Sequence, residues 1–473
     1  MREKCGIVGF YSLSGANVTP LILSSLEALQ HRGQESWGIA IEGHKPYRKL
    51  GLVPDVLTTK RRIVGKVGIG HVRYSTIGRT TLENAQPIQI GNKFSIAQNG
   101  TIVNFDTLQN ILKTNFAIKS YESDTKLIGL RLYQLLKESE WLEAFTQIGK
   151  ELLGSYCLTI LNNRCEVYGI RDPRGFRPLC IGWHEPSSSY LIASESCVLI
   201  AIGAEFIRDV EPGEVVKLSK DGFQSFRFAE RVRHYHCAFE YTYFAHPSSC
   251  IDGVCVYKVR KNIGRILAKK YSGWGDIVIP VPDSARPAAL GYSEVSGITF
   301  EEGLMKDRYR KRGMMRSFIE PTQTSREEIV KKIIPITHNV EGKDIVMVDD
   351  SIVRGTSSKI IVKLLKRAGA RRIRMVVTFP PIRYPCYMGI DFPTQDELLA
   401  YKLCGEESDI NKINEIVGAE IGVDQLGYND IEGLVEGIGL PKDELCLACV
   451  TGDYSCIGGK PKFRSREELK DKW

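Results

Sequence analysis

The sequence predicts an α/β protein with more than one domain, and three observations lead to this prediction. The chain has 473 residues, enough for two or three domains. About the first 230 residues alternate apolar and polar positions and contain frequent glycines, which is typical of many short strands. From about Cys255 onward, helical patterns alternate with apolar strand patterns, which indicates βαβ units and a parallel sheet.

In the first part, the clearest strand patterns are residues 66–73 and 156–161, and a helix is expected at residues 123–137. Cys5 begins another apolar, strand-like segment at residues 5–9. A cysteine in such a setting is most often a small core residue. Four further cysteines in apolar segments are expected to be core residues: Cys157, Cys165, Cys180 and Cys197.

In the second part, a helical pattern at residues 259–271 precedes an apolar strand at 277–281, and the alternation repeats through residues 345–379. The apolar run 345–348 is too short for a helix and is expected to be an interior parallel strand. It ends in two adjacent carboxylates, followed by a small-residue loop and a helical pattern. A loop before a helix N-terminus suits an anion, and paired carboxylates suit sugar hydroxyls or a cation. A phosphorylated sugar is therefore the expected ligand.

Composition and charge exclude several classes of protein. Apolar content of 43% and charged content of 25% are ordinary for a soluble protein, and no apolar run approaches the ~18 residues of a membrane span. We therefore expect a cytoplasmic protein without a membrane partner. Much of the net charge of +8 lies in residues 306–332, where nine Lys or Arg face four acids. Because no nucleic-acid module surrounds this cluster, a small polyanionic substrate is the expected partner.

Five segments of the first part together resemble the glutaminase domain of N-terminal-nucleophile amidotransferases, which has an αββα fold. They are residues 5–9, 31–35, 70–76, 98–100 and 123–124. The resemblance implies that Cys5 is the nucleophile that forms a thioester with glutamine, and that Asn99 and Gly100 form the oxyanion hole. It also implies that Arg73 holds the α-carboxylate of glutamine and Asp124 its α-ammonium group.

Cys5 does not begin the encoded chain, because four residues precede it. In this family the base is the α-amine of the cysteine itself, and a free α-amine has a pKa of about 7.7–8.0, suited to proton transfer near neutrality. We therefore expect residues 1–4 to be a propeptide that is cleaved. If they stay, glutamine-dependent activity should be nearly absent, while ammonia-dependent activity could survive.

The second part resembles a type I phosphoribosyltransferase domain, and the whole chain resembles the amidophosphoribosyltransferase family. Residues 344–358, 277–284 and 306–309 carry this resemblance. It implies that glutamine, phosphoribosyl diphosphate (PRPP) and water give 5-phosphoribosylamine, glutamate and diphosphate, the first committed step of de novo purine synthesis. The expected domains are the glutaminase domain at 5–234, the phosphoribosyltransferase domain at 235–440 and a tail at 441–473.

The same resemblance assigns a site for PRPP and Mg²⁺. Asp349 and Asp350 would hold the ribose hydroxyls and Mg²⁺, and backbone N–H groups of the next loop would hold the 5-phosphate. Residues 306–317 would form a flap that closes over the diphosphate. Ala285 stands where some family members have a serine that contacts the metal. The expected PRPP-binding residues are Asp283, Ser284, Arg308, Tyr309, Asp349, Asp350, Ser351, Arg354, Gly355, Thr356, Ser357 and Ser358.

Four cysteines match one branch of this family, which carries a [4Fe–4S] cluster. The resemblance implies a structural, oxygen-sensitive cluster on these thiolates, and zinc would accept the same set. The expected ligands are Cys237, Cys386, Cys446 and Cys449. Four cysteines are left without a role: Cys250, Cys255, Cys404 and Cys456.

The same motifs exclude one alternative function and leave another open. A hexosamine-forming amidotransferase would need sugar-isomerase domains in place of the Asp349–Asp350 loop, so it is excluded. A PRPP-binding regulator, or an ammonia-only transferase, with an inactive glutaminase half stays open. The resemblance further implies a homotetramer and feedback inhibition by purine nucleotides. Aromatic residues at 239–244 could line a path for ammonia, although plain packing is the commoner role of such residues.

Overall fold

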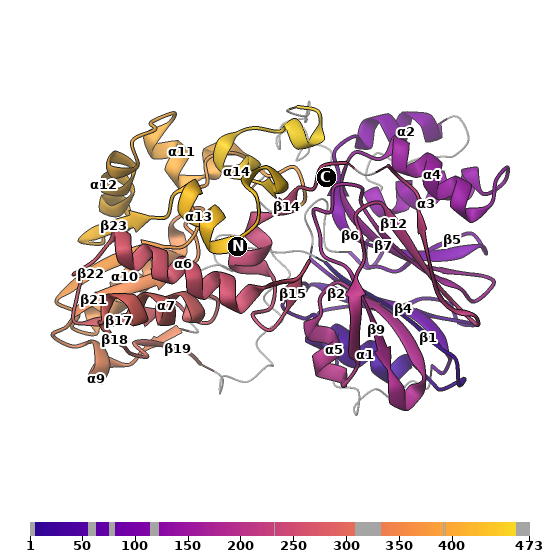
Figure 1. The fold of residues 1–473 in the computed structure, drawn as a ribbon, viewed down its shortest axis with the longest axis horizontal. Coiled ribbons are helices and arrows are strands. Elements are labelled where there is room, and N and C mark those ends of the chain that lie inside the picture. Colours follow the sequence, from indigo (N-terminus) through magenta and orange to yellow (C-terminus); the bar gives the residue numbers. More distant parts are fainter. Residues whose placement is uncertain are drawn as a thin grey trace.

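The computed structural model describes residues 5–54, 63–74, 81–113, 123–230, 232–307, 333–390, 392 and 394–459. These residues form two lobes that lie side by side (Figure 1). The amino-terminal lobe holds strands β1 to β13, and the carboxy-terminal lobe holds the elements that follow the junction strand β14. No helix in the described part of the chain is long and apolar enough to cross a membrane.

The first sheet of the amino-terminal lobe has seven described antiparallel strands, in the order β11–β9–β10–β1–β4–β2–β3. Its central strand β1 (Gly6–Ser12) is buried along its whole length. Helices α1 (Thr19–Ala28) and α5 (Cys197–Ile202) pack on its outer face. The other strands are β2 (Ser36–Ile41), β3 (Tyr47–Leu50), β4 (Val67–Arg73), β9 (Cys180–His184), β10 (Ser189–Ala193) and β11 (Glu205–Asp209).

The second sheet packs on the inner face of the first and has the order β13–β12–β8–β7–β6–β5. Because side chains alternate along a strand, Ile7 points into the layer between the sheets while Val8 packs under α1. Helices on the far side complete a helix–sheet–sheet–helix order, so the predicted αββα fold is confirmed. The elements are β5 (Ile88–Ile90), β6 (Phe94–Ile102), β7 (Gly154–Asn162), β8 (Val167–Arg171), β12 (Glu214–Ser219), β13 (Gly222–Arg227), α2 (Phe105–Lys113), α3 (Asp124–Leu135) and α4 (Trp141–Glu151).

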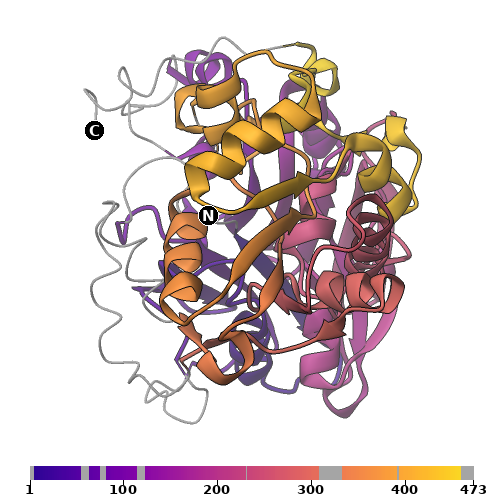
Figure 2. The same cartoon turned by 90° about the vertical axis from the view of Figure 1, so that its left-hand side faces the viewer.

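The carboxy-terminal lobe has a parallel sheet of five described strands, in the order β18–β17–β21–β22–β23 (Figure 2). Val346 and Val348 of β21 pack against α6, α7 and α13, while Ile345 and Met347 pack against α10 and α12. The strand is therefore apolar from Ile345 to Val348, as the sequence predicts for a parallel sheet covered on both faces. The elements are β17 (Ile277–Pro280), β18 (Thr299–Phe300), β21 (Asp344–Asp349), β22 (Arg372–Val377), β23 (Gln425–Tyr428), α6 (Val256–Lys270), α7 (Arg286–Ser296), α10 (Thr356–Arg367), α12 (Ile410–Ile421) and α13 (Ile431–Ile438).

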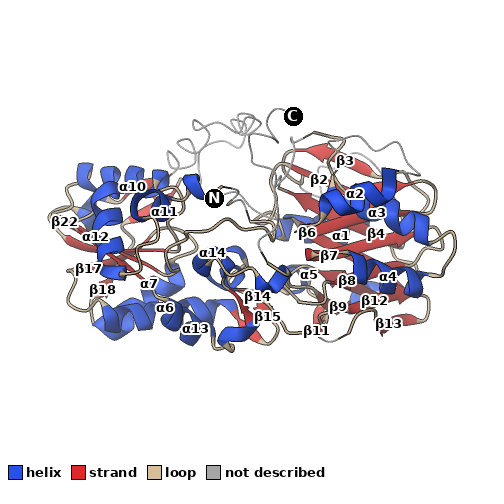
Figure 3. Cartoon of the chain, turned by 90° about the horizontal axis from the view of Figure 1, so that it is seen from above, coloured by secondary structure: helices blue, strands red, loops and turns tan. Residues whose placement is uncertain are grey.

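The junction between the lobes is built from segments far apart in the sequence. Figure 3 shows β14 (His236–Cys237), β15 (Cys250–Ile251) and α14 (Ala448–Thr451) between the two lobes. β14 pairs in parallel with β24 (Leu445–Cys446), so part of the predicted tail is fastened to the junction. The remaining strands and α-helices are β16 (Val254–Cys255), β19 (Leu304–Lys306), β20 (Ile333–Pro335), α9 (Thr337–Val340) and α11 (Leu399–Cys404).

Three of the four cysteines predicted to be core residues are buried: Cys157, Cys180 and Cys197. The prediction is wrong for Cys165, which is only partly buried. Its φ of +58° places it in the turn between β7 and β8 instead of in a strand.

Candidate functional site

Cys5 lies directly before β1, at the end of that strand where β4 also ends. Because Gly6 pairs with Val72 in the sheet, the register places Cys5 beside Arg73, the last residue of β4. The Cys5 Sγ lies 3.7 Å from the carbonyl oxygen of Tyr74. Burial raises the pKa of the Cys5 thiol, and the positive charge of Arg73 offsets only part of this rise. The thiol therefore needs a base to become a nucleophile near neutral pH.

Two opposite charges act on the pKa of the Cys5 thiol: Arg73 lowers it and Asp124 raises it. Arg73 is buried, and Asp124 begins α3. The Asp124 Oδ2 accepts a hydrogen bond of 3.3 Å from Gln98 Nε2, and Oδ1 accepts one of 2.9 Å from the N–H of Thr125. Burial raises the pKa of Asp124, although these hydrogen bonds lower it in part. A guanidinium and a carboxylate near the same thiol suit the two charges of a free amino acid.

Asn99 and Gly100 are neighbours on β6 with unusual environments. The side chain of Asn99 is fully buried, and neither its nitrogen nor its oxygen has a hydrogen-bond partner among the described residues. An unpaired buried amide costs about 1–3 kcal/mol, so it is expected to serve a ligand. Gly100 has a φ of +138°, and a Cβ there would lie 2.1 Å from the carbonyl oxygen of Ser155. The position therefore requires glycine.

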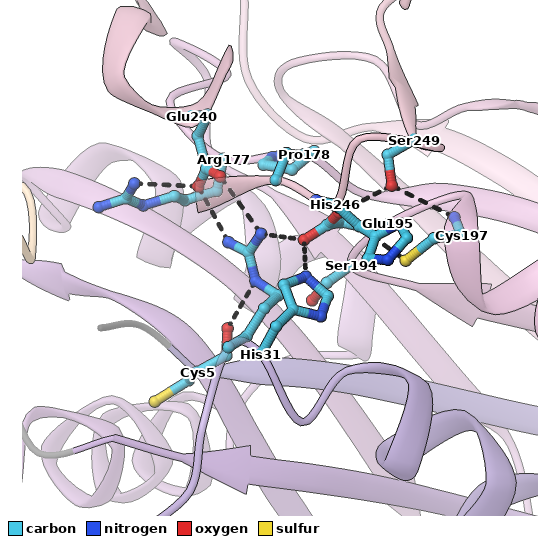
Figure 4. A network of polar contacts seen from close by, with 12 residues as sticks. Cys5, His31, Arg177, Pro178, Ser194, Glu195, Cys197, Glu240, His246 and Ser249 are labelled. Carbon is cyan, nitrogen blue, oxygen red and sulfur yellow. Dashed lines mark hydrogen bonds and ion pairs between the residues drawn. The ribbon is translucent and has the colours of Figure 1, made fainter. Parts of the chain in front are cut away.

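The backbone carbonyl of Cys5 is held by a residue to which the sequence analysis gave no role. Arg32 is almost fully buried and donates from Nε to the Cys5 oxygen at 3.2 Å. The same guanidinium donates to Glu195 and to Glu240, with 2.9 Å between Nη2 and Glu240 Oε1 (Figure 4). Arg177 Nη1 donates to the same Glu240 oxygen at 3.1 Å. Arg32 belongs to the 31–35 motif, but its partners lie 163 and 208 residues away, so no local signal revealed them.

The second cluster of predicted residues lies at the carboxyl end of β21. Asp349 and Asp350 are both buried. Ser284 Oγ donates to Asp350 Oδ2 at 2.5 Å, and Ser351 Oγ donates to Oδ1 at 2.7 Å. Burial raises the pKa of both carboxyl groups, and the charge of Asp350 raises that of Asp349 further. Two buried neighbouring carboxyl groups fit a divalent cation, whose charge would remove their repulsion.

Neighbouring strands bring the other PRPP-site residues to the same edge. β17 lies next to β21 in parallel, so the loop after β17 places Asp283 and Ser284 beside the Asp349–Asp350 pair. Asp283 Oδ2 accepts a hydrogen bond of 2.7 Å from Lys306 Nζ. Arg308, Tyr309 and the rest of the predicted flap lie outside the described residues.

The loop after Asp350 leads into the N-terminus of α10. Gly355 caps this helix with a φ of +72°, and Thr356 and Ser357 begin its first turn, followed by the buried Ser358. The first N–H groups of a helix have no partner within the helix, so they suit an anion. The guanidinium of Arg354 pairs instead with Glu397, at 2.7 Å from Nε to Oε2. We therefore expect Arg354 to serve an anion only through its backbone.

The four predicted ligand cysteines lie in the region of the junction. Cys237 and Cys446 are directly paired residues of β14 and β24, and Cys386 and Cys449 pack in the same apolar core as Cys237. Burial and the neighbouring Cys237 raise the pKa of the Cys386 thiol. Sequence analysis gave no role to Cys456, which is buried and packs against Cys386 and Cys446.

Known proteins match nearly the whole chain, and a family model matches part of the amino-terminal lobe. A family model described as a glutamine amidotransferase domain matches residues 71–201. The amidophosphoribosyltransferase of Methanocaldococcus jannaschii is 43% identical over an aligned length of 488 positions, and the alignment covers 98% of this chain and 100% of the relative. That of Bacillus subtilis is 39% identical over 472 residues, which cover 96% and 94%.

Two solved structures also match. The B. subtilis glutamine PRPP amidotransferase in complex with ADP and GMP has a TM-score of 0.80 and 38% identity, with 95% of this chain and 97% of that one covered. A structure described as the allosteric regulatory enzyme of purine biosynthesis has a TM-score of 0.81 and 39% identity, with 95% and 96% covered.

Proposed function

The chain belongs to the amidophosphoribosyltransferase family, and from this premise we propose how its residues divide the reaction. The enzyme catalyses the first step of purine biosynthesis, in which glutamine, PRPP and water give 5-phosphoribosylamine, glutamate and diphosphate. The amino-terminal lobe releases ammonia from glutamine, and the carboxy-terminal lobe joins it to the sugar. The observation that carries the residue assignment is the buried, unpaired amide of Asn99 beside Gly100.

In the amino-terminal lobe, the Cys5 thiol attacks the side-chain amide of glutamine and forms a thioester, with release of ammonia. The α-amine of Cys5 takes the thiol proton, which requires hydrolysis of the bond between residues 4 and 5. The raised pKa of Cys5 supports the need for this base. Residues 1–4 lie outside the described residues.

Around that thiol, Asn99 Nδ2 and the Gly100 N–H donate to the oxygen of the tetrahedral intermediate. Arg73 binds the α-carboxylate of glutamine, and Asp124 binds its α-ammonium group. The way both charges act on Cys5 supports this assignment. Water then hydrolyses the thioester and glutamate leaves.

In the carboxy-terminal lobe, Asp349 and Asp350 hold the ribose hydroxyls, and their charge stabilises the positive C1 as diphosphate departs. Mg²⁺, when bound there, would neutralise diphosphate oxygens. Asp283 and Ser284 lie beside the diphosphate, while Ser351 orients Asp350 through its 2.7 Å hydrogen bond. The first turn of α10 receives the 5-phosphate. Residues in the assigned 5-phosphate loop are Arg354, Gly355, Thr356, Ser357 and Ser358.

A path for ammonia is supported by contacts that join the two sites. Phe239 packs edge-on against Phe379 with ring centroids 4.8 Å apart, and the Phe379 N–H donates to the Asp350 carbonyl at 2.9 Å. On the other side, Glu240 binds Arg32, which binds Cys5. We expect Phe239→Ala to uncouple the sites, so that glutamate release exceeds phosphoribosylamine formation. Equal rates of the two products in this variant would contradict the path.

We assign the four junction cysteines to a [4Fe–4S] cluster, as expected for one branch of the family. The supporting observation is a donor set of thiols from three separate segments, with Cys237 and Cys446 in register. Such a cluster would fasten the tail to the junction. Anaerobic protein is expected to absorb near 400 nm and to contain about four irons per chain. A colourless protein with one zinc would overturn this assignment.

Regulation is also proposed from a relative, and assembly from the resemblance of the sequence to the family. The B. subtilis structure contains ADP and GMP, which supports inhibition of this enzyme by purine nucleotides. We further propose a homotetramer in the cytoplasm. Sedimentation analysis with and without nucleotides tests the assembly, and a mass of one or two chains would contradict it.

The decisive experiment compares two nitrogen sources. Cys5→Ala is expected to lose glutamine-dependent synthesis and glutamate release, but to keep synthesis from ammonium salts. Mass spectrometry of the active enzyme should find Cys5 as the first residue. A glutamine-active sample with residues 1–4 intact would refute the α-amine mechanism. A protein that binds PRPP but makes no product from either nitrogen source would instead be the regulator considered above.

A further inference from the structure

The hairpin of β15 and β16 places two cysteines without an assigned role opposite each other. Cys250 and Cys255 are directly paired in this hairpin. The next pair outward is hydrogen-bonded, with 3.0 Å between Val256 N and Ser249 O. Hydrogen-bonded and non-hydrogen-bonded pairs alternate along antiparallel strands, so the two cysteines form a non-hydrogen-bonded pair. Side chains approach each other most closely in such pairs.

Both thiols are reachable and near each other. Cys250 is exposed and Cys255 is partly exposed. Burial of part of the side chain, together with a direct interaction with the Cys255 thiol, raises the pKa of Cys250. Non-hydrogen-bonded pairs have Cα atoms about 4.5 Å apart, which falls within the 4.4–6.8 Å range of disulfides. The backbone therefore already meets the main geometric condition for a bond between the two sulfurs.

We propose that Cys250 and Cys255 form a reversible disulfide, a modification site at the junction of the lobes. The Cys250 thiolate attacks a sulfur of a glutathione-type disulfide, which releases one thiol and leaves a mixed disulfide. The Cys255 thiolate then attacks the Cys250 sulfur and releases the second thiol. Two protein thiols are oxidised to one disulfide, the S–S bond of the oxidant is reduced, and two protons pass to the released thiols.

The position of this pair favours a reversible bond over a permanent structural one. Only four residues, 251–254, separate the two cysteines, so closing the bond removes little chain entropy from the unfolded state. An exposed disulfide is also open to attack by reducing thiols.

The hairpin is connected to Cys5 by consecutive hydrogen bonds. Ser249, the residue before Cys250, donates from Oγ to Glu195 Oε2 at 2.7 Å. Glu195 pairs with Arg32, which donates to the Cys5 carbonyl at 3.2 Å (Figure 4). A bond between the cysteines fixes the two strands relative to each other next to Ser249. The glutamine-dependent rate should therefore depend on the oxidation state, a consequence that rests on the proposed role of Cys5.

The turn of the same hairpin is held from the other side. Asp252 accepts hydrogen bonds of 2.7 Å from both Nη1 and Nη2 of Arg171, and its Oδ2 lies 3.1 Å from His236 Nδ1. Arg171 belongs to the amino-terminal lobe, and His236 precedes the cluster ligand Cys237. With its turn fixed in this way, the hairpin would pass a change caused by disulfide formation to its open end, where Ser249 and Val256 lie.

The disulfide can be mapped directly on the whole enzyme. The protein is equilibrated anaerobically in buffers of reduced and oxidised glutathione, and free thiols are blocked with N-ethylmaleimide. Trypsin yields residues 234–258, and endoproteinase Asp-N then cuts before Asp252 and separates the two cysteines. The oxidised sample is expected to contain peptides 234–251 and 252–258 joined by a disulfide, with fragmentation placing the bond at Cys250 and not Cys237. Recovery of both cysteines blocked by N-ethylmaleimide, or separately joined to glutathione, would overturn the proposal.

Variants separate the disulfide from its effect on activity. Cys250→Ser and Cys255→Ser should each abolish the joined peptides, whereas Cys404→Ser, which alters another partly exposed cysteine, should keep them. In the unchanged enzyme, oxidation should lower the glutamine-dependent rate about fivefold without changing the ammonia-dependent rate. Cys255→Ser should show no such response. If the joined peptides are found but the glutamine-dependent rate is equal in both buffers, the disulfide stands and its effect on activity is refuted. If the joined peptides are found in a protein that never uses glutamine, the proposed role of Cys5 is contradicted.

Discussion

The two proposed sites differ in whether their buried charges are balanced by charges of opposite sign. Near Cys5, the charges of Arg32 and Arg177 are balanced inside the protein by Glu195 and Glu240. In the other lobe, Asp349 and Asp350 are buried side by side, and burial raises the pKa of both. A balanced site is organised before its substrate arrives, while a site of like charges is completed by a cation or a cationic transition state.

This difference suits the two reactions. Attack on an amide requires a thiol, a base and hydrogen-bond donors in fixed positions, and Arg32 helps to fix the carbonyl of Cys5. In the proposed mechanism, departure of diphosphate creates positive charge at carbon, and Asp349 and Asp350 would stabilise this charge only while they remain ionised. Substitutions at the site in the amino-terminal lobe should therefore lower only the glutamine-dependent rate. Substitutions at the site in the carboxy-terminal lobe should lower both the glutamine-dependent and the ammonia-dependent rate.

The largest effect is expected from Asp349→Asn combined with Asp350→Asn. Loss of both charges should reduce phosphoribosylamine formation on the order of 10³-fold with glutamine or ammonium alike. Diphosphate release measures the rate. Asp344→Asn is the matched control, because Asp344 begins the same strand and pairs with Arg371 at the opposite end. Undiminished synthesis from ammonium in the double variant would end the assignment.

Asn99→Ala should remove one donor to the tetrahedral oxygen. The glutamine-dependent kcat is expected to fall about 10²-fold, with the ammonia-dependent rate unchanged. Glutamate release measures the first rate. Asn162→Ala on the neighbouring strand, whose amide donates to Glu166 at 2.8 Å, should leave both rates intact. Equal loss of both rates in Asn99→Ala would show that Asn99 is structural.

Glu240→Gln tests the balanced charges themselves. Arg32 and Arg177 would then share one carboxylate fewer, which should destabilise the amino-terminal lobe by about 3 kcal/mol. Hydrogen exchange of the β1 amides measures this free energy. The control Glu27→Gln, on the exposed face of α1, should change it by less than about 0.5 kcal/mol. A neutral Glu240→Gln would mean that the network adds nothing to stability.

A smaller effect concerns pH. Burial lowers the pKa of His71 from 6.5 to about 3, and its Nε2 lies 3.1 Å from the carbonyl oxygen of Gln98. The unfolded chain gains a proton below pH 6.5 that the folded His71 does not, so stability is complete above that pH and falls below it. The loss should reach about 2 kcal/mol at pH 5. Denaturation at pH 7 and pH 5 should show less pH dependence in His71→Gln, while His44→Gln, at an exposed position, should behave like the unchanged protein.

Local patterns predicted much of the fold, and they also indicated the residues of one of the two proposed sites. The helical spacing that predicted 259–271 corresponds to α6, and the apolar run 345–348 lies within β21. The Asp349–Asp350 site follows directly from that strand and the next helix. Each of these signals is contained in a few consecutive residues, so sequence periodicity is sufficient to find them.

The contacts of Arg32 could not be predicted in this way, because its partners come from elements that meet only in the folded chain. The cysteine hairpin did have a local signal that was missed. Asp252 and Gly253 lie between two apolar residues and both have positive φ, which is typical of a two-residue hairpin turn. A two-residue turn at Asp252 and Gly253 sets a register in which Cys250 lies opposite Cys255.

The loop that contains Met388 and Gly389 contacts the amino-terminal lobe, and this contact limits how lobes can be exchanged between relatives. The Met388 carbonyl accepts hydrogen bonds from Ser155, at 2.7 Å, and from Arg177 in the amino-terminal lobe. A Cβ at the next residue, Gly389, would lie 3.1 Å from Thr101 Oγ1, directly beside Gly100 on β6. A chimeric enzyme would have to inherit the loop together with both donors. Chimeras with mismatched loops should hydrolyse glutamine poorly even though each parental lobe is intact.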